Sequence, residues 1–90
     1  MHEGFFDWDE SNEDHILAHG VSSAEVEEAL LDPKGLRADA RNTPDERRFA
    51  FVGSTEEERI LFIVYAERDG KVRPITARDA SVGQKRRYGR

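Results

Sequence analysis

An apolar run followed by a tight-turn dipeptide constrains the fold of this chain more than any other feature. The run, Ile60 to Tyr65, contains no charged residue and is typical of a central strand covered on both faces. Asp69-Gly70 is a strong signal for a two-residue turn, so residues Lys71 to Ala77 are predicted to pair back antiparallel. Pro74 cannot donate a backbone hydrogen bond, which places this last strand at a sheet edge or turns its nitrogen outward. The expected framework is a sheet built from hairpins.

Two further strands are predicted upstream of this run. Phe49 and Phe51 alternate with smaller residues over Arg47 to Gly53, and the polar segment from Ser54 to Glu58 turns the chain back. A weaker strand is predicted over Gly35 to Asp39, and residues 41–45 are predicted to form a loop. Together these segments predict a meander of three or four strands.

The first third of the chain has a helical pattern instead. Asp9 is a predicted N-cap for a helix from Glu10 to His19, and Gly20 follows where a left-handed stop is favoured. Ser22 to Glu25 form a capping box that starts a second helix, which ends at Asp32-Pro33. Ser81 to Tyr88 form a short basic segment that is compatible with a third helix. The predicted fold class is α+β, with two N-terminal helices on an antiparallel sheet and a short C-terminal helix.

Length and composition limit the classes of protein to consider. With 90 residues, of which 37% are hydrophobic, the chain is expected to form a single domain over 1–90 with one thin core. It has no cysteine, which excludes disulfides, thiolate zinc sites and a cysteine nucleophile. The N-terminus lacks a signal-peptide pattern, and no segment approaches the ~20 apolar residues of a membrane span. We therefore expect a cytoplasmic protein without membrane association.

The net charge of -5 hides a strongly uneven distribution of charge. Residues 1–32 contain ten Asp or Glu and no Lys or Arg, whereas residues 68–90 contain eight Lys or Arg and two acids. The basic end could contact phosphates. The alternative is that the two ends neutralise each other across the fold.

Several residues have side chains suited to phosphate chemistry. Arg47, Arg68 and Arg78 lie near strand ends, could converge, and carry the group that binds phosphate bidentately. His19 titrates near neutrality and could move a proton, although it could also serve only as a helix C-cap. Cleavage of RNA without a metal needs a group to deprotonate the 2'-hydroxyl, cations on the phosphate and a proton for the leaving oxygen. The alternative for each arginine is an ordinary ion pair with an acid such as Glu46 or Glu67.

Other candidate sites are weaker. Trp8, with Phe5 and Phe6, could stack on bases, but a lone Trp before a helix cap is more typical of a lid over the core. The spacing of the histidines does not favour a metal site, and we expect no metal or other cofactor. The basic cluster Lys85, Arg86 and Arg87, with Tyr88 beside it, suits phosphate or an acidic partner, or is simply a solvated tail.

A set of short motifs in a fixed order resembles the BrnT family of toxins. The motifs are Phe6-Asp7-Trp8-Asp9, His19-Gly20-Val21-Ser22, Asp32-Pro33, Glu46-Arg47, Val64-Tyr65 with Arg68, and Ala77-Arg78-Asp79-Ala80 with Tyr88. The resemblance implies a fold similar to the RelE-type toxins. It also implies a ribonuclease that arrests translation, which a BrnA-like antitoxin holds inactive. The ribbon-helix-helix part of that antitoxin binds operator DNA, so the toxin is expected to reach DNA only through its partner.

The resemblance also suggests roles for individual residues. Arg47 and Arg78 would stabilise the phosphate in the transition state, and His19 or Tyr88 would move a proton. Arg68, with the cluster Lys85, Arg86 and Arg87, would position the RNA substrate. An acidic or amphipathic antitoxin segment would cover Arg68, Arg78 and the basic tail. The resemblance further favours a homodimer within the antitoxin complex.

Besides Pro74, which replaces an apolar residue of the last strand, three positions depart from the family pattern. Ala18 stands where the family usually has Lys, His15 where it has Asn, and Gln84 where it has Glu. If that Lys or Glu takes part in catalysis, the chain is a weak ribonuclease. The alternative function is then a binding module that engages the antitoxin and acts as a co-repressor. Direct binding of DNA by residues 85–90 is a third reading, but the acidic first third argues against it.

Overall fold

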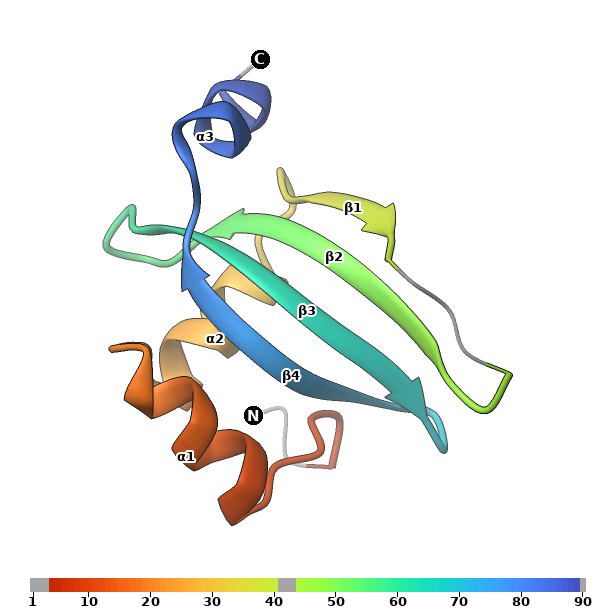
Figure 1. Cartoon of the computed structure of the whole chain (residues 1–90). Coiled ribbons are helices and arrows are strands. Elements are labelled where there is room, and N and C mark those ends of the chain that lie inside the picture. The colour runs from red at the N-terminus through yellow and green to blue at the C-terminus, as the bar shows by residue number, and fades with distance from the viewer. Residues whose placement is uncertain (1–3, 41–43, 90) are drawn as a thin grey trace.

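A computed structural model of the chain describes residues 4–40 and 44–89 (Figure 1). These residues contain three helices and four strands, joined by turns and loops. They are α1 (Glu10–Ala18), α2 (Ser23–Leu30), β1 (Leu36–Asp39), β2 (Arg47–Ser54), β3 (Ile60–Arg68), β4 (Lys71–Asp79) and α3 (Val82–Tyr88). Of the loop predicted over 41–45, residues 41–43 lie outside the described part. The order of elements confirms the predicted α+β class.

The four strands form one antiparallel sheet in the order β1-β2-β3-β4. Asp69 and Gly70 join β3 to β4 with φ of 53° and 75°, and positive φ at both positions is the geometry of a tight hairpin turn. Pro74 lies in β4 at the edge of the sheet, as the sequence predicted. Beyond this edge, Phe6 forms an isolated parallel bridge with Val72, so the N-terminal segment partly covers β4.

Side-chain caps fix where α1 and α2 begin. Asp9 accepts a hydrogen bond from the Asn12 backbone N–H, and the Asn12 side chain accepts one from Asp9 in return. The Asn12 amide also donates to the carbonyl oxygen of Pro74 at 2.9 Å, which attaches α1 to β4. Ser22 and Glu25 form the predicted capping box of α2.

The core lies between α1, α2 and one face of the sheet. Its fully buried members come from all of these layers, and they are Ile16, Val21, Val26, Ala29, Leu61, Ile63 and Ala77. Gly53 lets α2 approach β2 closely, because a Cβ atom at this position would lie 2.3 Å from the carbonyl oxygen of Ala29. Trp8 packs against this core as a lid, and its indole N–H donates to Glu27 at 2.8 Å.

The opposite face of the sheet is largely open, which corrects the prediction that β3 is covered on both faces. Leu61 and Ile63 are buried, but Phe62 and Val64, which alternate with them along β3, are only half-buried. The face lacks a full cover because α3 packs at one end of it, near the end of β2, whereas α1 and α2 pack on the other side (Figure 1). An apolar run without charges therefore does not distinguish a fully covered strand from one with an apolar open face.

None of the helices in the described ranges is long and apolar enough to span a membrane.

Candidate functional site

An arginine stacked on an aromatic ring marks the end of the open sheet face that lies near α3. Arg78 pairs with Phe62 across β4 and β3, and its guanidinium carbon lies 4.5 Å from the centre of the Phe62 ring. The guanidinium also donates to the carbonyl oxygen of Asp79 at 3.0 Å and to Gln84 Oε1 at 3.5 Å. Within residues 4–40 and 44–89, no carboxylate forms a salt bridge with Arg78. Its positive charge is exposed and free to meet an anion.

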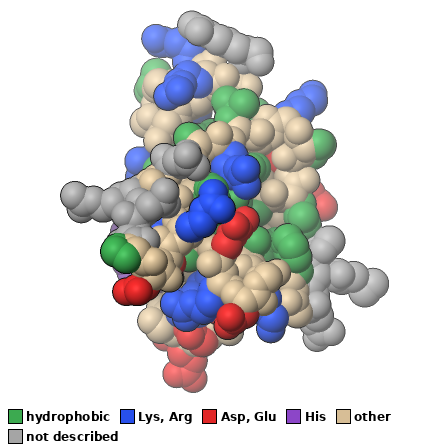
Figure 2. Space-filling view, turned by 90° about the vertical axis from the view of Figure 1, so that its right-hand side faces the viewer, with side chains coloured by type: hydrophobic (Ala, Val, Ile, Leu, Met, Phe, Trp, Pro, Cys, Tyr) green, Lys and Arg blue, Asp and Glu red, His purple; other side chains and the backbone are tan. Residues whose placement is uncertain are grey.

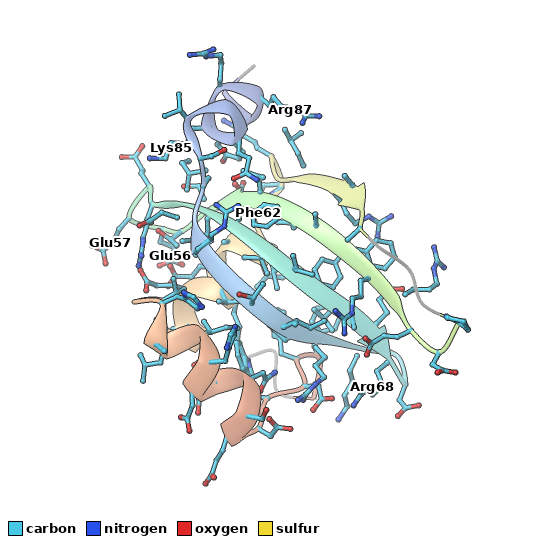
Figure 3. All side chains as sticks on the ribbon, in the orientation of Figure 1. Glu56, Glu57, Phe62, Arg68, Lys85 and Arg87 are labelled. Carbon is cyan, nitrogen blue, oxygen red and sulfur yellow. The ribbon has the colours of Figure 1, made fainter. Side chains whose placement is uncertain are left out.

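Helix α3 brings further cations to this end of the face. Figure 3 shows Arg87 and Lys85 on α3, with Phe62 on the sheet below. Lys85, Arg86 and Arg87 make no salt bridge within the described part of the chain. In the space-filling view, Lys and Arg side chains lie at the top, at the level of α3, and others lie in the middle and lower parts of the face beside acidic side chains (Figure 2). Together with Arg78, these residues form what we call the upper site: Phe62, Arg78, Gln84, Lys85, Arg86 and Arg87.

Gln84 is held at the upper site by the cap of α3. The side-chain Oε1 of Gln84 accepts a hydrogen bond from the backbone N–H of Ser81 at 2.8 Å, and the backbone N–H of Gln84 donates to Ser81 Oγ at 3.2 Å. This capping box fixes the side chain. The oxygen is occupied by Ser81, so the amide nitrogen is the group that remains available to a ligand.

Tyr88 fastens α3 to the rest of the fold. Its hydroxyl donates to Asp32 Oδ2, which also accepts from the Ser54 backbone N–H at 2.8 Å, while Asp32 Oδ1 accepts from the Lys34 N–H at 2.9 Å. Asp32 thus joins the end of α2, the end of β2 and α3. We call the Tyr88–Asp32 contact the latch.

The latch shifts the titration of both its members. Burial alone would raise the pKa of Asp32, but the hydrogen bonds from Tyr88, Ser54 and Lys34 outweigh it and lower the pKa below its usual range. The hydrogen bond to Asp32 raises the pKa of Tyr88, and burial acts in the same direction. Near neutral pH, therefore, the Tyr88 hydroxyl keeps its proton and Asp32 is ionised.

At the other end of the open face, arginines are paired with an acid. Glu46 accepts from Arg48 Nε at 2.8 Å and from Arg68 Nη2 at 3.2 Å. These hydrogen bonds, that of Arg48 first, lower the pKa of Glu46. Arg68 thus follows the ion-pair alternative derived from the sequence. We call Glu46, Arg48 and Arg68 the lower cluster.

The three arginines that could converge are kept apart by the sheet. Arg47 pairs with Glu67, five residues along β3 from the Phe62–Arg78 pair, which corresponds to roughly 17 Å of strand. Arg47 also lies on the helix side of the sheet, where its guanidinium carbon is 5.3 Å from the centre of the Phe49 ring. Figure 3 shows Arg68 at the far end of the sheet from Phe62.

His19 lies at the same end of the sheet as Arg78. It is the C-cap of α1, and the carbonyl oxygen of the next residue, Gly20, accepts a hydrogen bond from Arg59 at 3.0 Å. Arg59 in turn forms salt bridges with Asp79 at 2.8 Å and Glu25 at 3.0 Å. The side chain of His19 is exposed, and its ring meets that of His15 edge to face, with centroids 5.0 Å apart.

In the described residues, no group of three or more His, Asp or Glu side chains is arranged to hold a metal ion.

Sequence reasoning did not single out two important residues, Phe62 and Asp32. The signal for Phe62 was its alternation with Leu61 and Ile63, which places it on the opposite face of β3. Asp32 was interpreted as a helix stop and as part of the Asp32-Pro33 motif, with no assigned role, and its contact with Tyr88 spans 56 residues. No local pattern predicts a contact between residues that are so far apart in the sequence.

Comparison with known families agrees with this geometry. A family model described as the ribonuclease toxin BrnT of type II toxin-antitoxin systems matches residues 8–83. No curated protein sequence matches the chain. The match covers most of the chain, including α1, α2 and the whole sheet. The chain therefore belongs to the BrnT family of ribonuclease toxins of type II toxin-antitoxin systems.

Proposed function

We propose that this protein cleaves RNA at the upper site, without a metal ion. The observation that carries the proposal is Arg78, an exposed guanidinium with no carboxylate partner among the described residues, stacked on a half-buried aromatic ring on an open face. A phosphate needs such a cation, and an RNA strand needs an open, basic surface. Lys85, Arg86 and Arg87 of α3 extend that surface.

The reaction is an in-line attack of the RNA 2'-hydroxyl on the adjacent phosphorus. The bond from phosphorus to the 5'-oxygen breaks, which leaves a 2',3'-cyclic phosphate and a 5'-hydroxyl. Arg78 stabilises the charge that develops on the phosphate, as preorganised donors do in such transition states. Arg68 lies too far along the sheet to touch the same phosphate, so we assign it to a neighbouring part of the RNA strand. Arg47 lies on the helix side of the sheet, so we assign it no contact with RNA on the open face.

His19 is the better candidate for proton transfer of the two that the sequence offers. It is exposed at the same end of the sheet as Arg78, on the side where α1 packs, and an imidazole can both accept and donate a proton. The Tyr88 hydroxyl is engaged with Asp32, and its raised pKa makes it a poor base. We therefore assign Tyr88 to positioning α3.

The toxin is expected to be neutralised by a BrnA-like antitoxin of the ribbon-helix-helix type, which alone would contact operator DNA. Support for this partner is the family, whose members act in type II toxin-antitoxin pairs. An acidic antitoxin segment over Arg78 and α3 would neutralise cations that form no salt bridge within the described part of the chain. Co-expression with the neighbouring reading frame tests this pairing. We expect the two proteins to form a stable complex that does not cleave RNA.

Cleavage of an end-labelled RNA by the purified protein in EDTA tests the proposed activity. Wild type should cut, leave 2',3'-cyclic or 3'-phosphate ends, and lose the activity on Arg78→Ala. Cleavage that requires an added divalent cation would contradict metal independence.

A catalytically weak, antitoxin-binding co-repressor is the second candidate. Gln84 favours it, because an amide cannot accept a proton as a carboxylate does, and Ala18 supplies no cation. Wild type that folds but leaves RNA intact, while still binding its antitoxin, would establish this function instead. Substituting Ala18→Lys and Gln84→Glu together should then restore cleavage.

A further inference from the structure

A small apolar hollow lies beside Phe62 on the open face. The residues that line it include Ala38, Ala50, Val52, Phe62, Gln84 and Arg87. The hollow measures about 180 Å³, well below the roughly 300 Å³ at which pockets for drug-sized ligands begin. It is large enough for one ring system only. Leu36, which also lines it, is 45% exposed, so apolar surface is left uncovered at its edge.

The groups around the hollow are those that a base and its phosphate require. Small apolar residues and an aromatic ring provide a surface for stacking, which binds any base through its flat face. Arg87 lines the hollow, and the guanidinium of Arg78 lies over the ring of Phe62. Neither arginine has a carboxylate partner within the described ranges. A phosphate on either side of the base would therefore meet a cation.

Gln84 adds a hydrogen-bond donor of fixed direction. Its oxygen is taken by Ser81, and its amide nitrogen donates to no acceptor within residues 4–40 and 44–89. A base offers carbonyl oxygens and ring nitrogens that would accept this bond. An apolar protein side chain would instead leave the amide and the nearby cations without partners, which is costly.

We infer that the hollow binds one unpaired nucleobase of the RNA, with Phe62 as the stacking surface and the Gln84 amide as the donor to the base. This inference rests on the proposed function, because it concerns the same RNA, but it assigns a subsite for a base rather than for the reacting phosphate. It also gives Gln84 a role that a carboxylate at this position could not perform.

Binding of RNA that cannot be cleaved separates this subsite from catalysis. The probes are 2'-O-methyl tetranucleotides of each base and a tetranucleotide of the same backbone without bases, measured by fluorescence anisotropy. At least one base-bearing strand should bind wild type about fivefold or more tighter than the abasic strand, because stacking of a single base contributes at least that much. Equal affinities, within twofold, for the abasic strand and all four base-bearing strands would overturn the inference.

Two variants test the residues separately. Gln84→Glu keeps the capping box but removes the donor, and Phe62→Leu keeps an apolar side chain but removes the ring. In each variant the ratio of base-bearing to abasic affinity should fall at least threefold. Phe5→Leu, which removes an exposed ring outside the hollow, should leave the ratio unchanged. Loss of the ratio in Phe5→Leu as well, or in neither test variant, would contradict the assignment.

The added charge of Gln84→Glu repels the phosphate backbone of the base-bearing and abasic strands alike. The ratio of base-bearing to abasic affinity is therefore insensitive to this repulsion. Circular dichroism identifies a variant that fails to fold, in which case the other variant decides. A base preference without cleavage would refute the proposed function and leave the subsite standing. Cleavage without a base preference would refute the subsite and leave the proposed function standing.

Discussion

The two ends of the open sheet face use the same residue type for different purposes. At the lower cluster, Arg48 and Arg68 share the carboxylate of Glu46. At the upper site, Arg78 lies on Phe62 and has no carboxylate partner within the described residues. Both ends are exposed, so exposure does not separate them. What separates them is whether the positive charge is already neutralised.

This difference shows how exposed arginines in a small protein can be interpreted. An arginine beside a glutamate contributes to the surface of the fold, and a phosphate must displace the glutamate before it can bind. An arginine that stacks on an aromatic ring is held in one orientation, and no neighbouring carboxylate neutralises its positive charge. The upper site is therefore ready for an anion, and the lower cluster is not.

The largest predicted effect follows directly from this contrast. Arg78→Ala should lower the rate of RNA cleavage by about 100-fold, as expected when one transition-state donor is removed, whereas Arg68→Ala should lower it by less than about fivefold. Arg78→Lys should fall between them, because it keeps the charge but loses the planar donor. The measurement is the initial rate on one labelled RNA at fixed salt. Equal losses in the Arg78 and Arg68 variants would remove the distinction between the two ends.

The second effect concerns the latch that holds α3 at the upper site. Tyr88→Phe should lower activity about tenfold and destabilise the fold by about 1 kcal/mol, which lowers the melting midpoint by about 5 °C. Asp32→Asn should act similarly, and the double variant should be no worse than either single one, because both remove the same contact.

The pH profile of cleavage tells positioning apart from proton transfer at Tyr88. If Tyr88 only positions α3, the profile of Tyr88→Phe keeps the shape of the wild-type profile at a lower rate. If a limb of the profile disappears, Tyr88 moves a proton and our assignment is wrong.

A third change should make the two ends more alike. Glu46→Gln removes the carboxylate that Arg48 and Arg68 share, so Arg68 loses its salt-bridge partner and the positive charge at this end is no longer neutralised by Glu46. Affinity for single-stranded RNA should rise a few-fold at low salt, and the slope of log affinity against log salt should steepen by about 0.7 for each phosphate gained. Cleavage should change little. Glu67→Gln, an exposed acid that forms none of these contacts, is the matched control.

The smallest effect is a stability window set by the latch. Because the pKa of Asp32 is lowered in the fold, its contribution is present above the unfolded value near 3.8 and is lost as pH falls through the folded value. Because the pKa of Tyr88 is raised, its contribution is present below about 10 and is lost as pH rises through the folded value. The melting midpoint of wild type should therefore exceed that of Tyr88→Phe most between about pH 4 and pH 10, and this difference should shrink below and above that range.

Tyrosinate absorbance provides the direct check on the alkaline limb. One of the two tyrosines of wild type should ionise at a higher pH than in Asp32→Asn. Identical titrations in the two proteins would show that the latch does not form in solution.

Local patterns in the sequence were sufficient for most of the fold. Asp9 and Ser22 mark the starts of α1 and α2 because capping is a contact between residues three apart. Asp69-Gly70 marks its hairpin because few residues adopt the required positive φ. The open face could not be predicted in the same way, because the apolar run of β3 has the same composition whether or not a helix covers it.

The candidate site was harder to predict because it depends on contacts between distant segments. Arg47, Arg68 and Arg78 looked equivalent in the sequence, and only the register of the sheet places them at different ends and faces. The pairing of Arg68 with Glu46 spans 22 residues, and that of Tyr88 with Asp32 spans 56. Family motifs identified these residues but not which of them act together.

Mapping the RNA contact by NMR tests the distinction between the two ends most directly. A 2'-O-methyl RNA that cannot be cleaved is titrated into isotopically labelled protein, and shifts of backbone amides and arginine Nε–H groups are followed. Our interpretation predicts that the earliest and largest shifts arise from Phe62, Arg78 and α3, with Arg48 and Arg68 responding only at higher RNA concentration. Shifts that begin at Arg48 and Arg68 and leave Arg78 unchanged would contradict it.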